Sequence, residues 1–296
     1  LESLVADEMK RLQLKNVRAE NGRVHCDGDF ADIARLNINL RCGARVLLEM
    51  GSFMAPDFES LFQGVLSIPW EEFIPRDGEF PVKGYTLNSM LHSVPACQAI
   101  VKKASAKRMG QAYGCETLPE TGTRYQIHFA IIKDVATLYL DTSGVGLHKR
   151  GYRQGVGIAP INEVLAAGLI QLSGWKADSH FFDPMCGSGT ILIEAAMYAN
   201  NIPAQYYRKK FGFMRWKEFN NSEWKGVKER LDRGIREFEY EIWGSDIDPT
   251  VIDQAEKNLR FAKLHHDVCL FPNSFEFQDA PEGECMIITN PPYGER

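Results

Sequence analysis

The sequence lacks the patterns that mark membrane-spanning, disulfide-bonded and zinc-binding proteins. No apolar run approaches the roughly 18 residues that suggest a membrane-spanning helix. The seven cysteines include no C-x-x-C pair, and their odd number favours reduced thiols in the cytoplasm. His265, His266 and Cys269 form the only metal-like cluster, and without a second ligand pair they are better interpreted as the surface of a helix end. We therefore expect a cytoplasmic protein without a metal.

The sequence also lacks the excess of positive charge that is typical of nucleic-acid-binding proteins. Its net charge is −5, but the excess of acidic residues is distributed unevenly along the chain. Residues 1–157 carry 19 Lys and Arg against 18 Asp and Glu, whereas residues 158–296 carry 15 against 21. The front portion is therefore the better candidate for contacts with phosphate.

A glycine-rich turn follows the apolar strand that ends at Asp183. Gly187 and Gly189 allow the backbone to approach a ligand closely. Thr190 then begins a helix, whose free N–H groups favour a carboxylate or phosphate. Asp183, at the tip of the strand, can accept hydrogen bonds from an ammonium group. A ligand with both an amine and a carboxylate fits this pattern, and the methionine half of S-adenosylmethionine is such a ligand.

Two other cofactor classes are excluded by what the turn lacks. A P-loop needs a lysine after its second glycine, and none follows Gly189. A dinucleotide fingerprint needs a third glycine where Leu192 stands. A glycine turn without any ligand stays open on this motif alone. The cofactor contacts that we expect here are Asp183, Pro184, Met185, Cys186, Gly187, Gly189 and Thr190.

A second motif, Asn290-Pro291-Pro292-Tyr293, follows another apolar strand. An exocyclic base amine is a poor nucleophile because its lone pair is delocalised into the ring. The Asn290 oxygen and the Pro291 carbonyl, fixed by two prolines, can hold the amine hydrogens and aim the lone pair at a sulfonium methyl. Tyr293 offers a ring on which an extruded base can stack. We expect these four residues to be catalytic, Asn290 also lying beside the cofactor, with no general base required.

Four strands of an α/β sheet are predicted at residues 179–183, 240–246, 275–279 and 285–289. Asp246, at the tip of the second, is expected to bind the ribose hydroxyls, with Ile247 against the adenine. Asp246 could instead be an N-cap, but Asp248 fills that position better for the helix predicted to follow it. Asp279, at the tip of the third strand, is expected to accept from the adenine amine.

The front portion alternates between strands and helices. The predicted strands are 23–27, 46–50, 80–85 and a hairpin of 125–131 with 136–140, and the predicted helices are 29–40, 58–68 and 93–109. The last helix carries Lys102, Lys103, Lys107 and Arg108, which alone would indicate a solvated face. Arg150 and Arg153 could belong to a domain hinge or meet RNA phosphate. Residues 203–224 interleave aromatic and basic side chains, which suits either RNA stacking or a packed excursion.

The sequence resembles the THUMP-containing RNA guanine-N2 methyltransferases, in particular the bacterial 23S rRNA enzymes often labelled N6-adenine-specific DNA methylases. The resemblance rests on Asp-Pro-Met-Cys-Gly-Ser-Gly-Thr, Gly-Ser-Asp-Ile-Asp and Asn-Pro-Pro-Tyr-Gly-Glu-Arg, with further matches at residues 141–144 and 149–153. It implies S-adenosylmethionine as cofactor, and an RNA partner contacted by the basic residues of 102–108 and by Arg150 and Arg153. An rRNA or a tRNA could be that partner, and N6-adenine methylation of DNA stays open because Asn-Pro-Pro-Tyr accepts either amine.

The resemblance also implies an α/β fold in four parts. These are a ferredoxin-like portion (1–44), a THUMP RNA-binding domain (45–142), a linker (143–157) and a Rossmann-like class I methyltransferase domain (158–296). That last fold has seven strands, of which four are predicted here, and the front portion would ordinarily begin with a strand. We therefore expect a sequence that is trimmed at both ends.

Overall fold

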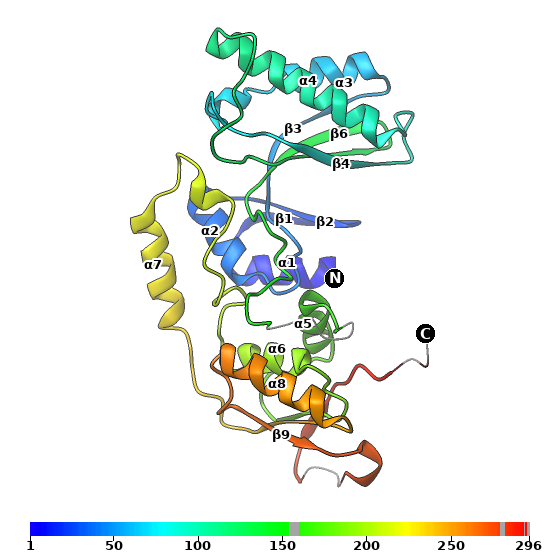
Figure 1. Ribbon diagram of the computed structural model, residues 1–296, viewed down its shortest axis with the longest axis vertical. Helices are drawn as coiled ribbons and strands as arrows, with labels where there is room; N and C mark the ends of the chain where they lie inside the picture. The colour runs from blue at the N-terminus through cyan, green and yellow to red at the C-terminus, as the bar shows by residue number, and fades with distance from the viewer. Residues whose placement is uncertain (154–159, 279–281, 293, 295–296) are drawn as a thin grey trace. The chain divides into compact units, whose positions relative to one another are not determined.

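The computed structural model describes residues 1–153, 160–278, 282–292 and 294, and the chain forms two compact units (Figure 1). Unit 1 contains residues 1–44, 146–209 and 220–296, and unit 2 contains residues 45–145 and 210–219. The chain therefore enters unit 2 and leaves it twice. Among the described residues, no helix combines the length and the apolar character needed to cross a membrane.

Unit 1 is built on a parallel sheet with the strand order β10-β7-β8-β9. The strands are β7 (His180–Asp183), β8 (Ile242–Asp246), β9 (Val268–Pro272) and β10 (Cys285–Ile287). The helices after residue 160 are α5 (Glu163–Leu172), α6 (Thr190–Ala199), α7 (Asn221–Asp232) and α8 (Pro249–Phe261). Because all four strands are parallel, their carboxyl ends meet at one edge, where open α/β sheets bind ligands.

Helix α6 lies in the core of unit 1. Of its 10 residues only Tyr198 is not buried, as expected for a helix that is apolar all round. Glu194 is the one charged residue in this run, so the fold carries a carboxylate into the core. A buried charge needs a partner.

The third strand of the sheet is β9, so the prediction of a strand at residues 275–279 is wrong. Residues Phe275–Phe277 form the short 3-10 helix η3 instead. Phe277 is 79 % exposed and Phe275 is also exposed, so neither side chain packs as a sheet residue would. Val268 pairs with Ile242 of β8 in their place. Asp279 lies outside the described residues.

The first 44 residues belong to unit 1 and form α1 (Glu2–Arg11), β1 (Lys15–Glu20), β2 (Arg23–Asp27) and α2 (Phe30–Asn39). Strands β1 and β2 form an antiparallel hairpin. The sequence did not indicate β1 because its side chains are nearly all exposed and polar. Helix α2 begins with a capping box, in which the Asp29 and Asp32 side chains each accept from the other residue's backbone N–H. Helix α2 packs against α7.

Unit 2 is a four-stranded sheet with the order β3-β6-β5-β4, in which only β4 and β5 are parallel. Its elements are β3 (Leu47–Met54), α3 (Phe58–Ser67), η1 (Trp70–Glu72), β4 (Val82–Leu87), α4 (Val94–Tyr113), β5 (Ile127–Ile132) and β6 (Val135–Asp141). Helices α3 and α4 pack together on one side of this sheet (Figure 1). The predicted hairpin is confirmed, and its turn residues Lys133 and Asp134 both have positive φ.

Residues 210–219 return from unit 1 to pack within unit 2. The amides of Gly212 and Phe213 donate to the carbonyls of Ser143 and Thr142, at 3.1 and 2.8 Å. The ring of Trp216 stacks on Tyr125 with 5.5 Å between centroids. Phe211, Phe213 and Trp216 are buried. These three side chains are packed within unit 2, and they offer no exposed surface on which RNA bases could stack.

Candidate functional site

The glycine turn joins β7 to α6 as the sequence predicts. Gly187 and Gly189 have φ values of 51° and 76°, a conformation that favours glycine. A Cβ on Gly189 would lie 3.1 Å from the Cβ of Ala255, so this position serves packing against α8. A Cβ on Gly187 would meet no described atom within 4 Å. The backbone at Gly187 therefore faces open space, where a ligand can approach it.

The turn is held in place by β8 and α8. The Cys186 amide donates to the Ser245 carbonyl at 2.9 Å, and the Asn258 side chain donates to the Ser188 carbonyl at 3.0 Å. The Ser245 hydroxyl donates to the Pro184 carbonyl at 3.3 Å. Burial raises the pKa of the Cys186 thiol, so this residue packs as a neutral side chain rather than acting as a nucleophile. The turn is thus preorganised before any ligand arrives.

Asp246 binds the glycine turn directly. One carboxylate oxygen accepts from the Gly187 amide at 2.9 Å, and the other accepts from the Asp248 amide at 3.1 Å. Asp248 is the N-cap of α8, accepting from the Thr250 amide at 2.8 Å, so Asp246 does not have that function. Each oxygen of Asp246 keeps a lone pair for a further donor such as a hydroxyl. The neighbouring Ile247 is 75 % exposed and offers an apolar surface.

Asp183 is the most perturbed carboxyl group at this edge of the sheet. It is 1 % exposed and accepts from the Met185 amide at 3.2 Å. Burial raises the pKa of Asp183 to about 7, and the negative charge of Asp246 acts in the same direction. Perturbed carboxyl groups of this kind gather at functional sites. A cation bound here would return Asp183 to its charged form.

Asn290 follows β10 at the same edge. In the register of the sheet Ile287 is opposite Phe182, and the Ile288 amide donates to the Phe182 carbonyl at 3.1 Å. The chain beyond Ile288 therefore continues beside Asp183. Asn290 and Pro291 are half-buried, and Pro292 is exposed. Tyr293 lies outside the described residues, so its predicted role stays untested.

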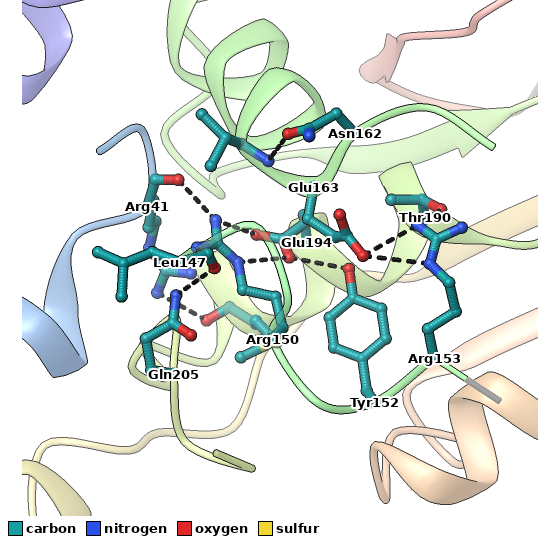
Figure 2. Close-up of polar contacts among 12 residues, drawn as sticks. Arg41, Leu147, Arg150, Tyr152, Arg153, Asn162, Glu163, Thr190, Glu194 and Gln205 are labelled. Carbon is teal, nitrogen blue, oxygen red and sulfur yellow. Dashed lines mark hydrogen bonds and ion pairs between the residues drawn. The ribbon is translucent and has the colours of Figure 1, made fainter. Parts of the chain in front are cut away.

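Arg150 is not available to RNA, contrary to the prediction. It is 1 % exposed, and its guanidinium donates to Glu194 at 3.2 Å, to the Leu147 carbonyl at 2.8 Å and to the Arg41 carbonyl at 2.5 Å (Figure 2). The Tyr152 hydroxyl also donates to Glu194, at 2.9 Å. The sequence did contain a sign of this contact, because Glu194 is a charged residue within an apolar helix and therefore needs a buried partner. Arg150 and Tyr152 are those partners.

Arg153 is half-buried and contacts the start of α6. Its guanidinium pairs with Glu163 at 3.1 Å and donates to the Thr190 hydroxyl at 3.1 Å. Its nearest partners therefore belong to unit 1 itself. The sequence suggested a hinge or a phosphate contact for this residue, and Glu163 was not recognised as its partner.

Two of the four basic residues of α4 have acidic partners, and the other two are exposed. Lys102 donates to Glu120 at 2.6 Å and lies over the ring of Phe80, and Arg108 forms an ion pair with Glu71. Both are occupied by neighbours within unit 2. Lys103 and Lys107 are exposed, so for these two a contact with RNA stays a prediction.

Family models match three parts of the chain. A RlmL ferredoxin-like domain matches residues 1–47, a THUMP domain matches residues 55–141, and an RMKL-like methyltransferase domain matches residues 150–296. Together these matches cover nearly the whole chain.

Related proteins have the same arrangement. The Bacillus subtilis "Putative RNA methyltransferase YpsC" is 39% identical over 100% of this chain and 77% of its own length. The "Ribosomal RNA large subunit methyltransferase K/L" of Psychromonas ingrahamii is 34% identical over 100% of this chain and 40% of its own length. The crystal structure of SMU.472, "a putative methyltransferase complexed with SAH", superimposes with a TM-score of 0.93 at 37% identity, covering 100% of this chain and 78% of that one. The chain therefore belongs to the THUMP-containing family of RMKL-like methyltransferases.

Proposed function

We propose that this protein transfers a methyl group from S-adenosylmethionine to the exocyclic N2 amine of a guanosine in RNA, with 23S rRNA as the favoured substrate. The observation that carries the proposal is the carboxyl edge of β10, β7 and β8. There the open backbone at Gly187, the carboxylates of Asp183 and Asp246, and Asn290 come from neighbouring strands. The residues that we propose for the cofactor and for the target amine therefore lie at one edge.

The cofactor can be assigned to this edge by chemical complementarity. The methionine ammonium suits Asp183, whose ionised form it would stabilise, and the methionine carboxylate suits the N-terminus of α6. The ribose hydroxyls suit Asp246, which keeps free lone pairs. The adenine suits the exposed side chain of Ile247. Asp279 is assigned to the adenine amine from the sequence alone.

The target amine is assigned to Asn290 and Pro291. Their oxygens would accept the two amine hydrogens and direct the nitrogen lone pair toward the sulfonium methyl. The methyl leaves with its bond to sulfur broken, which yields S-adenosylhomocysteine and a cationic amine that then loses a proton to solvent. Such acceptors act most strongly in the transition state, when the nitrogen becomes positive. Pro292 stiffens this segment, and Tyr293 is assigned to stacking of the extruded base.

An RNA substrate is favoured over DNA by the THUMP domain match and by the names of both curated relatives. The K/L relative is named for ribosomal RNA. Methylation of a tRNA guanosine would use the same architecture and is the second candidate. N6-adenine methylation of DNA is the third, because an adenine amine could occupy the same two acceptors.

The experiment that tests the proposal is methyl transfer from labelled S-adenosylmethionine by the complete gene product. Unmodified 23S rRNA fragments, tRNA and duplex DNA are the substrates, and the products are digested to nucleosides and separated by mass spectrometry. We expect N2-methylguanosine from the rRNA. N6-methyladenosine from DNA, with no label in RNA, would refute the proposal.

A further inference from the structure

Arg153 and Glu163 form an ion pair beside the first residue of α6, outside the residues predicted to bind the cofactor. The Arg153 Nε donates to Glu163 Oε1 at 3.1 Å, and its Nη2 donates to Thr190 Oγ1 at 3.1 Å. Figure 2 shows Arg153 beside Glu163 and Thr190. The Nη2 also donates to the Ile161 carbonyl at 3.3 Å. Glu163 is the first residue of α5 and is buried. The guanidinium is thus anchored on α5 and directed at the start of α6.

This contact determines what the Thr190 hydroxyl can do. A hydroxyl has one hydrogen to donate and can accept at its lone pairs, whereas a guanidinium can only donate. Because Thr190 Oγ1 accepts from Arg153, its own hydrogen is left for a different acceptor. Ser188 Oγ is 3.5 Å away, at the limit of a hydrogen bond. Thr190 is 3 % exposed, so bulk water has little access to it.

A carboxylate is the acceptor that suits this position best. The N–H groups of the first turn of α6 favour an anion, and the Arg153 charge adds to that preference. A hydrogen bond from a hydroxyl to a carboxylate is stronger than one to a second hydroxyl. In the proposed orientation of S-adenosylmethionine, its methionine carboxylate is the anion at this end of α6.

We propose that Arg153 is a positioning residue that fixes the Thr190 hydroxyl as a hydrogen-bond donor to the cofactor's carboxylate. The linker before the methyltransferase domain thereby takes part in recognising the amino-acid end of the cofactor. This inference rests on the proposed orientation of the cofactor, with its ribose at Asp246 and its carboxylate at α6.

The test compares two ligands that share their adenosine and thioether groups. S-adenosylhomocysteine carries the amino-acid end, and 5′-methylthioadenosine lacks it. Calorimetry would measure both affinities for the wild type, Arg153→Ala, Arg153→Lys, Thr190→Val and the double variant Arg153→Ala/Thr190→Val. Arg236→Ala is the matched control, because Arg236 donates to the Ala199 carbonyl at the opposite end of α6, at 3.1 Å.

We expect Arg153→Ala and Thr190→Val each to weaken S-adenosylhomocysteine by about 10-fold, the usual scale for a hydrogen bond to a charged group. Neither should change the affinity for 5′-methylthioadenosine. The double variant should lose little more than either single variant, because both changes remove the same contact. Arg153→Lys should recover part of the affinity, and Arg236→Ala should leave the ratio of the two affinities unchanged.

Two outcomes would overturn the inference. Equal weakening of both ligands by Arg153→Ala would mean that Arg153 only stabilises the fold, and full additivity in the double variant would mean that it does not act through Thr190. If Arg153→Ala does not fold, Thr190→Val alone decides, and unchanged S-adenosylhomocysteine affinity there refutes the role. Failure of the proposed cofactor site would look different, since Asp246→Ala would then leave both ligands unaffected.

Discussion

Unit 1 places charged groups inside its fold, whereas the charged residues of α4 in unit 2 stay at the surface. In unit 1, Arg150, Glu194 and Asp183 are almost completely buried. In unit 2, Lys102 and Arg108 pair with acids at the surface of their own unit. Charged side chains are therefore buried in unit 1, whereas in α4 of unit 2 Lys103 and Lys107 are exposed and Lys102 and Arg108 are paired with acids. We therefore expect changes to the buried charges of unit 1 to alter stability, and loss of Lys103 and Lys107 in unit 2 to alter RNA binding.

The largest effect is expected at the pair formed by Arg150 and Glu194. Glu194→Ala leaves a buried guanidinium without its carboxylate, so we expect a loss of about 3–5 kcal/mol in the free energy of unfolding. Chemical denaturation measures this loss. Replacement of both residues by apolar ones of similar size, Arg150→Met with Glu194→Leu, should cost less than Glu194→Ala because no unpaired charge is left by this pair. Some loss should persist, since the Tyr152 hydroxyl and the Leu147 and Arg41 carbonyls also lose a partner. A surface-like loss below about 1 kcal/mol for Glu194→Ala would contradict the buried pair.

Asp183 should destabilise the unliganded protein at high pH. Its pKa in the folded state is raised to about 7 from the ordinary value of 3.8, so folding is penalised as the pH rises above 3.8, and the penalty is complete above about 7. Asp183→Asn should therefore be the more stable protein at pH 8, by up to about 4 kcal/mol from the size of the shift.

Thermal unfolding of both proteins over a pH series measures this effect. The advantage of Asp183→Asn should shrink as the pH falls toward 4, and S-adenosylhomocysteine should bind the variant more weakly at every pH. A stability difference that does not change with pH would show that Asp183 titrates normally.

Asn290 tests whether the polar groups at the edge of unit 1 act in catalysis rather than in stability. Asn290→Ala should reduce the rate of methyl transfer by about 100-fold, the scale expected for one preorganised polar group. Single-turnover transfer with cofactor and RNA saturating measures it. Asn290→Asp should be milder, because a carboxylate also accepts the amine hydrogens. A near-normal rate in Asn290→Ala would exclude the proposed mechanism.

The smallest effect is expected in unit 2, where α4 separates its four basic residues into exposed and paired ones. Lys103→Ala with Lys107→Ala should weaken RNA binding and reduce its dependence on salt, by about 0.7 in the logarithmic slope for each lost contact to a single strand. Lys102→Ala with Arg108→Ala is the matched control, since those side chains already have acidic partners. Equal salt slopes for the two double variants would mean that the exposed lysines contribute no more to RNA binding than the two paired residues do.

Several features were predictable because they depend on residues close together in the chain. The positive φ values at Gly187, Gly189 and the Lys133-Asp134 turn follow from local conformation, and the N-cap of α8 follows from Asp248 and Pro249.

Pairing between distant segments was not predictable in the same way. The third strand was misplaced because Phe275 and Phe277 have the alternation of a strand, and only the register with β8 shows that Val268 occupies that place.

The sequence by itself therefore determined the glycine turn, the order of its motifs and the family resemblance, since these are properties of short segments. Only the tertiary structure decided which charged side chains are buried and which partners they have. Arg150 reaches Glu194 across 44 residues of chain, and Trp216 reaches Tyr125 from the methyltransferase half. A side chain's burial depends on what packs around it, because a charge is tolerated inside a protein only where a partner is brought to it. A basic residue in the sequence thus indicates a cation, and the fold determines whether that cation meets solvent or a buried carboxylate.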